Sequence, residues 1–285
     1  MQSLKSNKGK VIIAGAGPGD PDLITMKAVF YLQKANVVLT DRLVSEEILK
    51  RYVNINAEII HVGKQCRRAK SARQKTINEM LVEYALQGKL VVRLKGGDVS
   101  LFSNILDELQ ILTAHHIPYE IVPGVTAGAG AAAYAGIPLT ARSYSTGVRF
   151  LTYYQSTKLT DEYWKELAQT DDTLLFYMSS ETLDDLVNKL IENKISPDKL
   201  LAVAEQATTP MQQVYISDIY QYHTTLQGKI FLSPSMVIIG RVVALHEQFK
   251  WFNSNNTGEH YFTPLTGSVE SILFTENENK YAGRA

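Results

Sequence analysis

Short runs of β-branched and apolar residues alternate along this chain with longer segments whose apolar residues recur at helical spacing. This alternation is typical of α/β folds, in which helices cover a sheet. In the first half, the helices are expected at residues 23–33, 46–51, 71–87 and 103–114, with Ser103 as the N-cap of the last. Strands are predicted at residues 11–14, 37–40, 58–62, 90–94 and 119–122.

The second half repeats the alternation after a segment of small residues at 124–136, which we expect to be a helix against which another element packs closely. The chain between the strands on either side of residues 208–210 is too short for a helical crossover, so we expect an antiparallel pair there. The other predicted elements are helices at 161–169 and 183–193, and strands at 148–153, 173–178, 200–205, 212–216 and 236–240.

These patterns predict an α/β protein of two domains, with the small-residue segment near their boundary. The first domain is expected at residues 1–122 and the second at residues 123–252. The remaining residues, 253–285, are polar and aperiodic, and we expect them to form a mobile tail.

Charge and cysteine content narrow the classes of partner. The 285 residues contain 29 Lys plus Arg and 29 Asp plus Glu, so an extended surface for nucleic acid or anionic membrane is not expected. Cys66 is the single cysteine, which excludes internal disulfides and Cys-rich metal sites, and the six histidines show no ligand spacing. We therefore expect no metal site. Neither a signal peptide nor a membrane span is evident, so we expect a cytoplasmic protein.

A glycine-rich turn, Gly15-Ala16-Gly17-Pro18-Gly19, follows the first strand and suggests a dinucleotide site. Three details argue against this interpretation. The third glycine comes one residue early, and Pro18 lacks an N–H that a pyrophosphate would need. Asp20 and Asp22 place negative charge at the helix N-terminus, where phosphates would otherwise bind. A tight structural turn and a turn that contacts a ligand without phosphates remain as the other interpretations.

Two more glycine turns follow predicted strands, at residues 96–98 and 123–128. Glycine permits close approach of backbone to ligand, and Asp98 offers acceptor oxygens for hydroxyls or an ammonium. Three such turns at one edge of a sheet indicate a ligand held mainly by backbone groups, with hydroxyls and an amino-acid moiety. We therefore expect a small-molecule site at this edge.

A basic segment follows the third predicted strand. It contains six cations and no acid, which are Lys64, Arg67, Arg68, Lys70, Arg73 and Lys75. In a neutral chain such a cluster indicates a local polyanion site, and a solvated surface loop is the alternative. Nucleic acid is disfavoured because the segment has no interleaved aromatic residues.

Several of these segments together resemble the tetrapyrrole methylase family, the class III S-adenosylmethionine-dependent methyltransferases. The resemblance extends over residues 9–252. Its most specific motifs are GAGPGDPDLITMKA at 15–28, VVRLKGGD at 91–98, VPGVTAG at 122–128 and AEQATTPMQQ at 204–213.

The resemblance implies two α/β domains with S-adenosylmethionine between them, usually in a homodimer. It implies C-methylation of uroporphyrinogen III at C2 and C7 to precorrin-2, for sirohaem or cobalamin, with Asp41 as proton acceptor and Lys64 as proton donor. The carboxylates of the substrate would contact Arg67, Arg68, Arg73, Arg142 and Arg149. The cofactor would contact Pro18, Gly96, Gly97, Asp98, Leu101, Thr126, Ala127, Met178 and Ala207.

One segment departs from the family pattern. The family usually continues GGD with a proline and then F-G-R-G-G-E-E, whereas Val99 stands at the proline and Asn104 at the arginine. Ile105 and Leu106 replace the glycine pair, which predicts a longer, stiffer helix after the turn. A methylase acting on another tetrapyrrole or on a protein side chain is therefore an alternative, as is a protein that binds S-adenosylmethionine without turnover.

Overall fold

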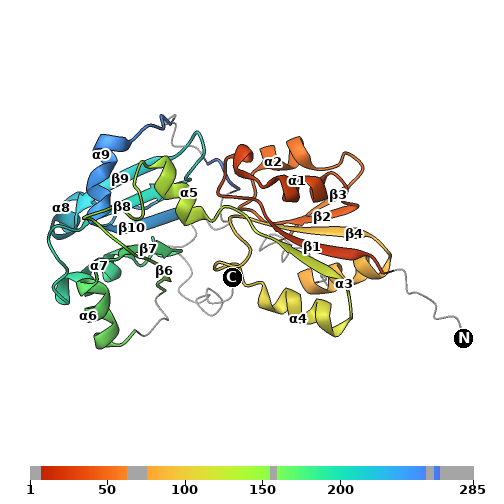
Figure 1. Ribbon diagram of the computed structural model, residues 1–285, viewed down its shortest axis with the longest axis horizontal. Coiled ribbons are helices and arrows are strands. Elements are labelled where there is room, and N and C mark those ends of the chain that lie inside the picture. Colours follow the sequence, from red (N-terminus) through yellow and green to blue (C-terminus); the bar gives the residue numbers. More distant parts are fainter. Residues whose placement is uncertain (1–7, 63–75, 155–158, 255–259, 264–285) are drawn as a thin grey trace, which may run out of the picture. The chain divides into compact units, whose positions relative to one another are not determined.

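The computed structural model describes residues 8–62, 76–154, 159–254 and 260–263, and it divides into two compact units. The first unit comprises Met1–Thr126 and Phe262–Ala285, and the second comprises Ala127–Tyr261. Each unit is built around its own five-stranded sheet (Figure 1). Among the described residues, no helix has both the length and the apolar character that crossing a bilayer requires.

The sheet of the first unit is entirely parallel, with the strand order β3-β2-β4-β1-β5. Its strands are β1 (Lys10–Gly15), β2 (Val37–Thr40), β3 (Glu58–His61), β4 (Leu90–Lys95) and β5 (Tyr119–Val122). Because all five strands run in one direction, all five carboxyl ends meet at the same edge of the sheet. The segments that follow the strands are thereby brought together there.

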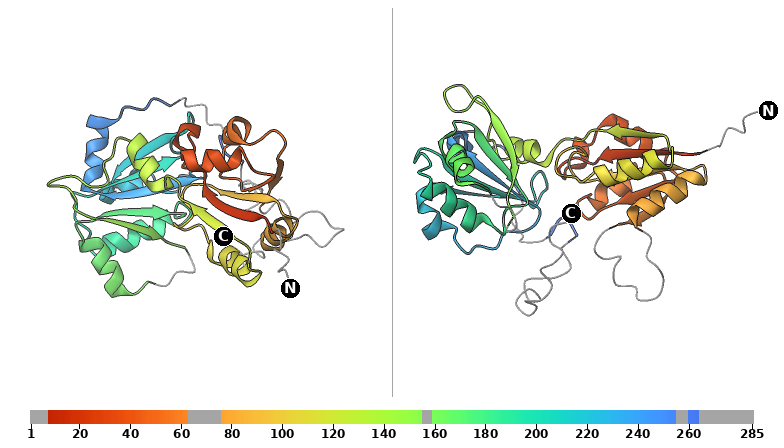
Figure 2. Two further views of the ribbon diagram at one scale, coloured as in Figure 1. Left: turned by 45° about the vertical axis from the view of Figure 1, so that its right-hand side comes forward. Right: turned by 90° about the horizontal axis from the view of Figure 1, so that it is seen from below.

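Two helices cover each face of this sheet (Figures 1 and 2). Along β2, Val38 packs toward one pair of helices and Leu39 toward the other, as expected for a strand buried on both faces. The first pair is α1 (Met26–Leu32) and α2 (Glu46–Tyr52), and the second is α3 (Ile77–Leu86) and α4 (Leu106–Ala114). This three-layer arrangement confirms the α/β fold class.

Two predicted helix starts were wrong. The helix expected from residue 23 begins at Met26, after a 3₁₀ turn at Pro21–Leu23, because Thr25 caps it by accepting from the N–H of Ala28. The predicted N-cap Ser103 does not cap α4; its hydroxyl donates to the carbonyl of Val99.

The helix extension that was expected from Ile105 and Leu106 is also not seen. Phe102 and Asn104 both have φ of 51°, a left-handed conformation that interrupts a helix, so α4 begins only at Leu106. Residues 71–75 of the helix predicted at 71–87 lie outside the described residues.

The second unit has a mixed sheet in the order β6-β7-β10-β8-β9. β6 and β7 are parallel, and the other three pairings are antiparallel, which confirms the antiparallel pair predicted around residues 208–210. The strands are β6 (Val148–Thr152), β7 (Thr173–Tyr177), β8 (Leu200–Glu205), β9 (Gln213–Asp218) and β10 (Ser235–Gly240).

The helices of the second unit also lie on both faces of its sheet. The small-residue helix α5 (Ala127–Tyr134) packs on one face so closely that a Cβ at Gly128 would lie 2.1 Å from Leu175 Cδ2. The other face is covered by α6 (Asp161–Gln169) and α7 (Leu183–Glu192). The short elements are η3 (Ile219–Gln221), α8 (Tyr222–Thr225), η4 (Arg241–Leu245) and α9 (His246–Phe249).

Candidate functional site

The three glycine turns touch one another at the carboxyl edge of the first sheet. Gly17 and Gly97 exchange two backbone hydrogen bonds, of 3.1 and 2.7 Å. A Cβ on Gly15 would lie 2.5 Å from the carbonyl oxygen of Gly97 and 2.7 Å from the Cα of Gly124. Glycine is therefore required by close backbone contact between turns that are far apart in the sequence. The predicted convergence at one edge is confirmed.

Asp98 links the second turn to the third. One carboxylate oxygen accepts from the Ser100 N–H at 2.8 Å, and the other accepts from the Gly124 N–H at 2.9 Å. Burial alone would raise the pKa of Asp98, but the hydrogen bonds from the Ser100 hydroxyl and the Gly124 N–H outweigh it and lower the pKa. The side chain is therefore an anionic brace between two turns.

Asp41 comes directly after β2 at the same edge. Its Oδ1 accepts from the Leu43 N–H at 3.0 Å, and its side chain keeps 27% of its exposure. The cap of α2 is Ser45, which accepts from the Ile48 N–H at 3.3 Å. Asp41 therefore does not serve as a helix cap, and its carboxylate is oriented by the tight turn after the strand.

A group of buried charges beside Asp41 was missed in the sequence. Arg93 Nε donates to Glu108 Oε1 at 2.9 Å, and Lys95 Nζ lies 3.3 Å from both oxygens of Glu108. Burial, and then the charge of Arg93, lower the pKa of Lys95. The signal was available, because two cations in the otherwise apolar strand β4 require buried partners.

Two of the predicted cofactor residues of the second unit, Met178 and Ala207, share one edge of its own sheet. Met178 follows β7 and Ala207 follows β8, and both strands run opposite to β10. Met178 has φ of 54°, and Thr208, next to Ala207, has φ of 67°. Such left-handed residues are costly and concentrate at ligand sites. The Tyr154 hydroxyl donates to Met178 Sδ at 3.0 Å, and burial raises the pKa of Tyr154.

The predicted substrate-binding residues and the predicted proton donor lie in different environments. Arg142 is exposed, and no ion pair joins it to a described residue. Arg149 is held between Asp172, 2.7 Å from its Nε, and Glu166, 2.6 Å from its NH1. These two carboxylates raise the pKa of Arg149 and occupy both sides of its guanidinium. The candidates outside the described residues are Lys64, Arg67, Arg68 and Arg73.

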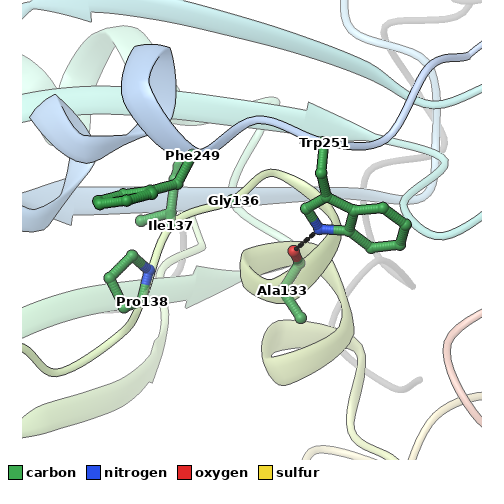
Figure 3. Close-up of a pocket in the computed structure, with 6 residues that line it drawn as sticks. All are labelled: Ala133, Gly136, Ile137, Pro138, Phe249 and Trp251. Atoms are coloured by element: carbon green, nitrogen blue, oxygen red, sulfur yellow. Dashed lines mark hydrogen bonds between the residues drawn. The ribbon is translucent and has the colours of Figure 1, made fainter.

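A hollow of about 320 Å³ lies elsewhere in the second unit (Figure 3). The indole of Trp251 borders it and donates to the carbonyl of Ala133 at 2.9 Å. Its other lining residues are Gly136, Ile137, Pro138 and Phe249. The lining has no titratable side chain, so this hollow has no groups for acid–base chemistry. Across residues 8–62, 76–154, 159–254 and 260–263, no group of three His, Cys, Asp or Glu is placed to hold a metal ion.

Comparisons with known proteins agree with the resemblance seen in the motifs. Residues 10–222 match the model of the family of tetrapyrrole (corrin/porphyrin) methylases. The chain is 45% identical over 244 residues to a siroheme synthase of Saccharophagus degradans, covering 86% of this chain and 53% of that protein. It is 42% identical over 247 residues to the uroporphyrinogen-III C-methyltransferase of Bacillus subtilis, covering 86% and 95% of the two chains.

Solved structures give the same result. The uroporphyrin-III C-methyltransferase of Thermus thermophilus, complexed with S-adenosyl homocysteine, superimposes with a TM-score of 0.68 at 31% identity. The match covers 82% of this chain and 93% of that one. The chain spans about half the length of the siroheme synthases that it matches. From the family match and the identity to full-length relatives, it follows that this chain belongs to the tetrapyrrole (corrin/porphyrin) methylase family.

Proposed function

We propose that the chain is an S-adenosylmethionine-dependent methyltransferase that methylates uroporphyrinogen III at C2 and C7 and releases precorrin-2. The observation that carries the proposal is the cradle of three glycine turns, joined by Gly17, Gly97 and Asp98 at the carboxyl edge of the first sheet. The names of the Bacillus subtilis and Thermus thermophilus relatives support this substrate.

The donor set of the turns fits S-adenosylmethionine. The turns offer backbone N–H and carbonyl groups, the carboxylate of Asp98, and no cation, which suits ribose hydroxyls and an amino-acid group better than phosphate. When bound, this cofactor supplies a sulfonium methyl group that is already activated for displacement by carbon. The proposed contacts are Pro18, Gly96, Gly97, Asp98, Leu101 and Thr126 in the first unit, and Ala127, Met178 and Ala207 in the second.

The chain itself then has two tasks, positioning and proton transfer. A methylated pyrrole carbon leaves the ring cationic, and neutrality returns when a neighbouring meso C–H bond breaks and its electron pair enters the ring. We assign Asp41 as the acceptor of that proton, because its carboxylate is partly exposed and oriented by Leu43 at the same edge as the glycine cradle. Lys64 is proposed as the proton donor.

The eight carboxylates of uroporphyrinogen III need cationic partners, and the basic segment offers Arg67, Arg68 and Arg73. Arg142 is exposed and is proposed to contribute from the second unit. Arg149 is paired with Asp172 and Glu166, so a contact between Arg149 and a substrate carboxylate stays a prediction. The homodimer and the cytoplasmic location stay predictions, and sedimentation of the purified chain tests the first of them.

The decisive experiment is an anaerobic incubation with S-adenosylmethionine and freshly generated uroporphyrinogen III, followed by mass analysis of the oxidised tetrapyrrole. A gain of two methyl groups supports the proposal and shows that Asn104 is compatible with both transfers. A gain of one means that the altered segment around Asn104 impedes the second transfer. No gain, with S-adenosylhomocysteine still bound in calorimetry, refutes this substrate and favours another methyl acceptor or a binding protein.

A further inference from the structure

The buried charges of the first unit form a connected group that costs free energy to bury. Arg93, Lys95 and Glu108 keep only 4%, 6% and 5% of their exposure. Removing three charges from water carries a desolvation penalty of several kcal/mol each, and apolar residues of similar volume often fill such a site without loss of stability. One cation would suffice to neutralise Glu108 and anchor α4 to the sheet, so the second cation calls for another role.

Arg93 is the member of this group that reaches beyond Glu108. Its NH1 lies 3.4 Å from the carbonyl oxygen of Leu39 and 3.1 Å from that of Leu94. Leu39 is the register partner of Arg93 on β2, so the guanidinium lies across the end of that strand, two residues before Asp41. Its NH2 lies 3.8 Å from Asp41 Oδ2.

The planarity of the guanidinium turns these contacts into a fixed orientation. Glu108 holds Nε and two backbone carbonyls hold NH1, so the plane of the group cannot rotate and NH2 must face Asp41. Asp41 Oδ1 is held from the other side by the Leu43 N–H. The Asp41 carboxylate thus lies between a backbone donor, the Leu43 N–H, and the guanidinium of Arg93, whose own orientation is fixed by Glu108.

We propose that Arg93, oriented by Glu108, is a positioning residue that holds the Asp41 carboxylate for removal of the meso proton. This inference rests on the proposed function and on Asp41 as the proton acceptor. Arg93 acts through Asp41 and does not itself contact the substrate. Lys95 is assigned only the structural task of neutralising Glu108.

The test compares three variants with the wild-type chain. Arg93→Met removes the guanidinium, and Glu108→Gln keeps the shape of the side chain but weakens the lock. Lys199→Met is the control for lost stability, because Lys199 is another buried cation, 2% exposed, which donates to the carbonyls of Ala168 and Thr170 in the second unit. Each variant is assayed for methyl transfer with ordinary uroporphyrinogen III and with substrate deuterated at its meso carbons.

If Arg93 positions the base, proton removal becomes slower than methyl transfer in Arg93→Met and Glu108→Gln. We expect kcat to fall by about 10- to 100-fold, the cost of misplacing a catalytic group by about 1 Å. The deuterium isotope effect on kcat should grow in both variants, while the Kd for S-adenosylhomocysteine stays at the wild-type value. Lys199→Met should lower the melting temperature without changing the isotope effect.

A fall in kcat with an unchanged isotope effect in both variants overturns the proposal, because it would mark a purely structural network. An inactive wild-type chain would instead overturn the proposed function, and the positioning role with it.

A second readout does not depend on turnover. The ¹³Cγ resonance of Asp41, assigned by its loss in Asp41→Asn, should move in Arg93→Met and remain in place in Lys199→Met. Glu108→Gln covers the case in which Arg93→Met does not fold. An unmoved resonance in a folded Arg93→Met or Glu108→Gln chain would also contradict the proposed contact.

Discussion

Replacing Gly124 with alanine tests whether the three glycine turns must touch for the cradle to exist. The new Cβ would lie 2.3 Å from the carbonyl oxygen of Gly97 and 2.9 Å from the Cα of Gly15. Both neighbours are backbone atoms, so neither can swing away as a flexible side chain would. Ordinary contact begins near 3.4 Å, so the third turn must move from the second by about 1 Å.

This displacement has two measurable consequences. Overpacking of this kind costs about 2 kcal/mol, which lowers the melting temperature by about 4–8 °C for a unit of this size. Moving Gly124 also strains its N–H bond to Asp98, which is 2.9 Å long, and so disturbs the brace between the turns. Losing one such bond weakens the binding of S-adenosylhomocysteine by about tenfold, equivalent to about 1.4 kcal/mol.

The control is Gly240→Ala in the second unit. Gly240 is buried, but a Cβ there would meet its nearest atom, Thr173 Cα, at an ordinary 3.5 Å. Scanning calorimetry of both variants should show a loss only for Gly124→Ala, and titration calorimetry should show weaker cofactor binding only there. Equal stability and equal affinity in Gly124→Ala and wild type would refute the argument that glycine is required by contact between the turns.

Three further predictions concern stability. Burial raises the pKa of Glu205 above 4.5, so the folded state gains stability as the pH falls from that raised pKa toward 4.5. Glu205→Gln should remove this part of the pH dependence of the unfolding free energy, measured by urea titration at several pH values. The hydrogen bond from Lys10 leads a set of contacts that lowers the pKa of Glu120 to about 2. The contribution of Glu120 is present above pH 4.5 and is lost as the pH falls through about 2, so Glu120→Gln should unfold at higher pH in acid titrations followed by circular dichroism. Leu190→Ala should cost about 3 kcal/mol in denaturant unfolding because Leu190 is fully buried, whereas Leu86→Ala, at a position 52% exposed, should cost less than about 0.5 kcal/mol; equal losses would contradict the assigned core.

The sequence predicted the elements of the first sheet and the meeting of its glycine turns, but not the start of α4. Ser103 has the chemistry of an N-cap, yet Asn104 adopts φ of 51° and Ser103 bonds back to Val99. Cap propensity is a local preference, and here the backbone of the preceding loop overrides it. The same limit applies to Arg149, whose charge suggested a substrate carboxylate but whose partners are Asp172 and Glu166.

The sequence by itself determined the features that depend on residues close together along the chain. Apolar runs place the strands, and glycines at their carboxyl ends, such as Gly15 and Gly97, mark the edge of the cradle. Only the tertiary structure decided which charges meet. Arg93 pairs with Glu108 fifteen positions away, and its NH2 lies 3.8 Å from Asp41 Oδ2, just after the end of β2. Such pairings depend on strand order and helix packing, because a buried charge is stabilised by whichever distant partner the fold brings within reach.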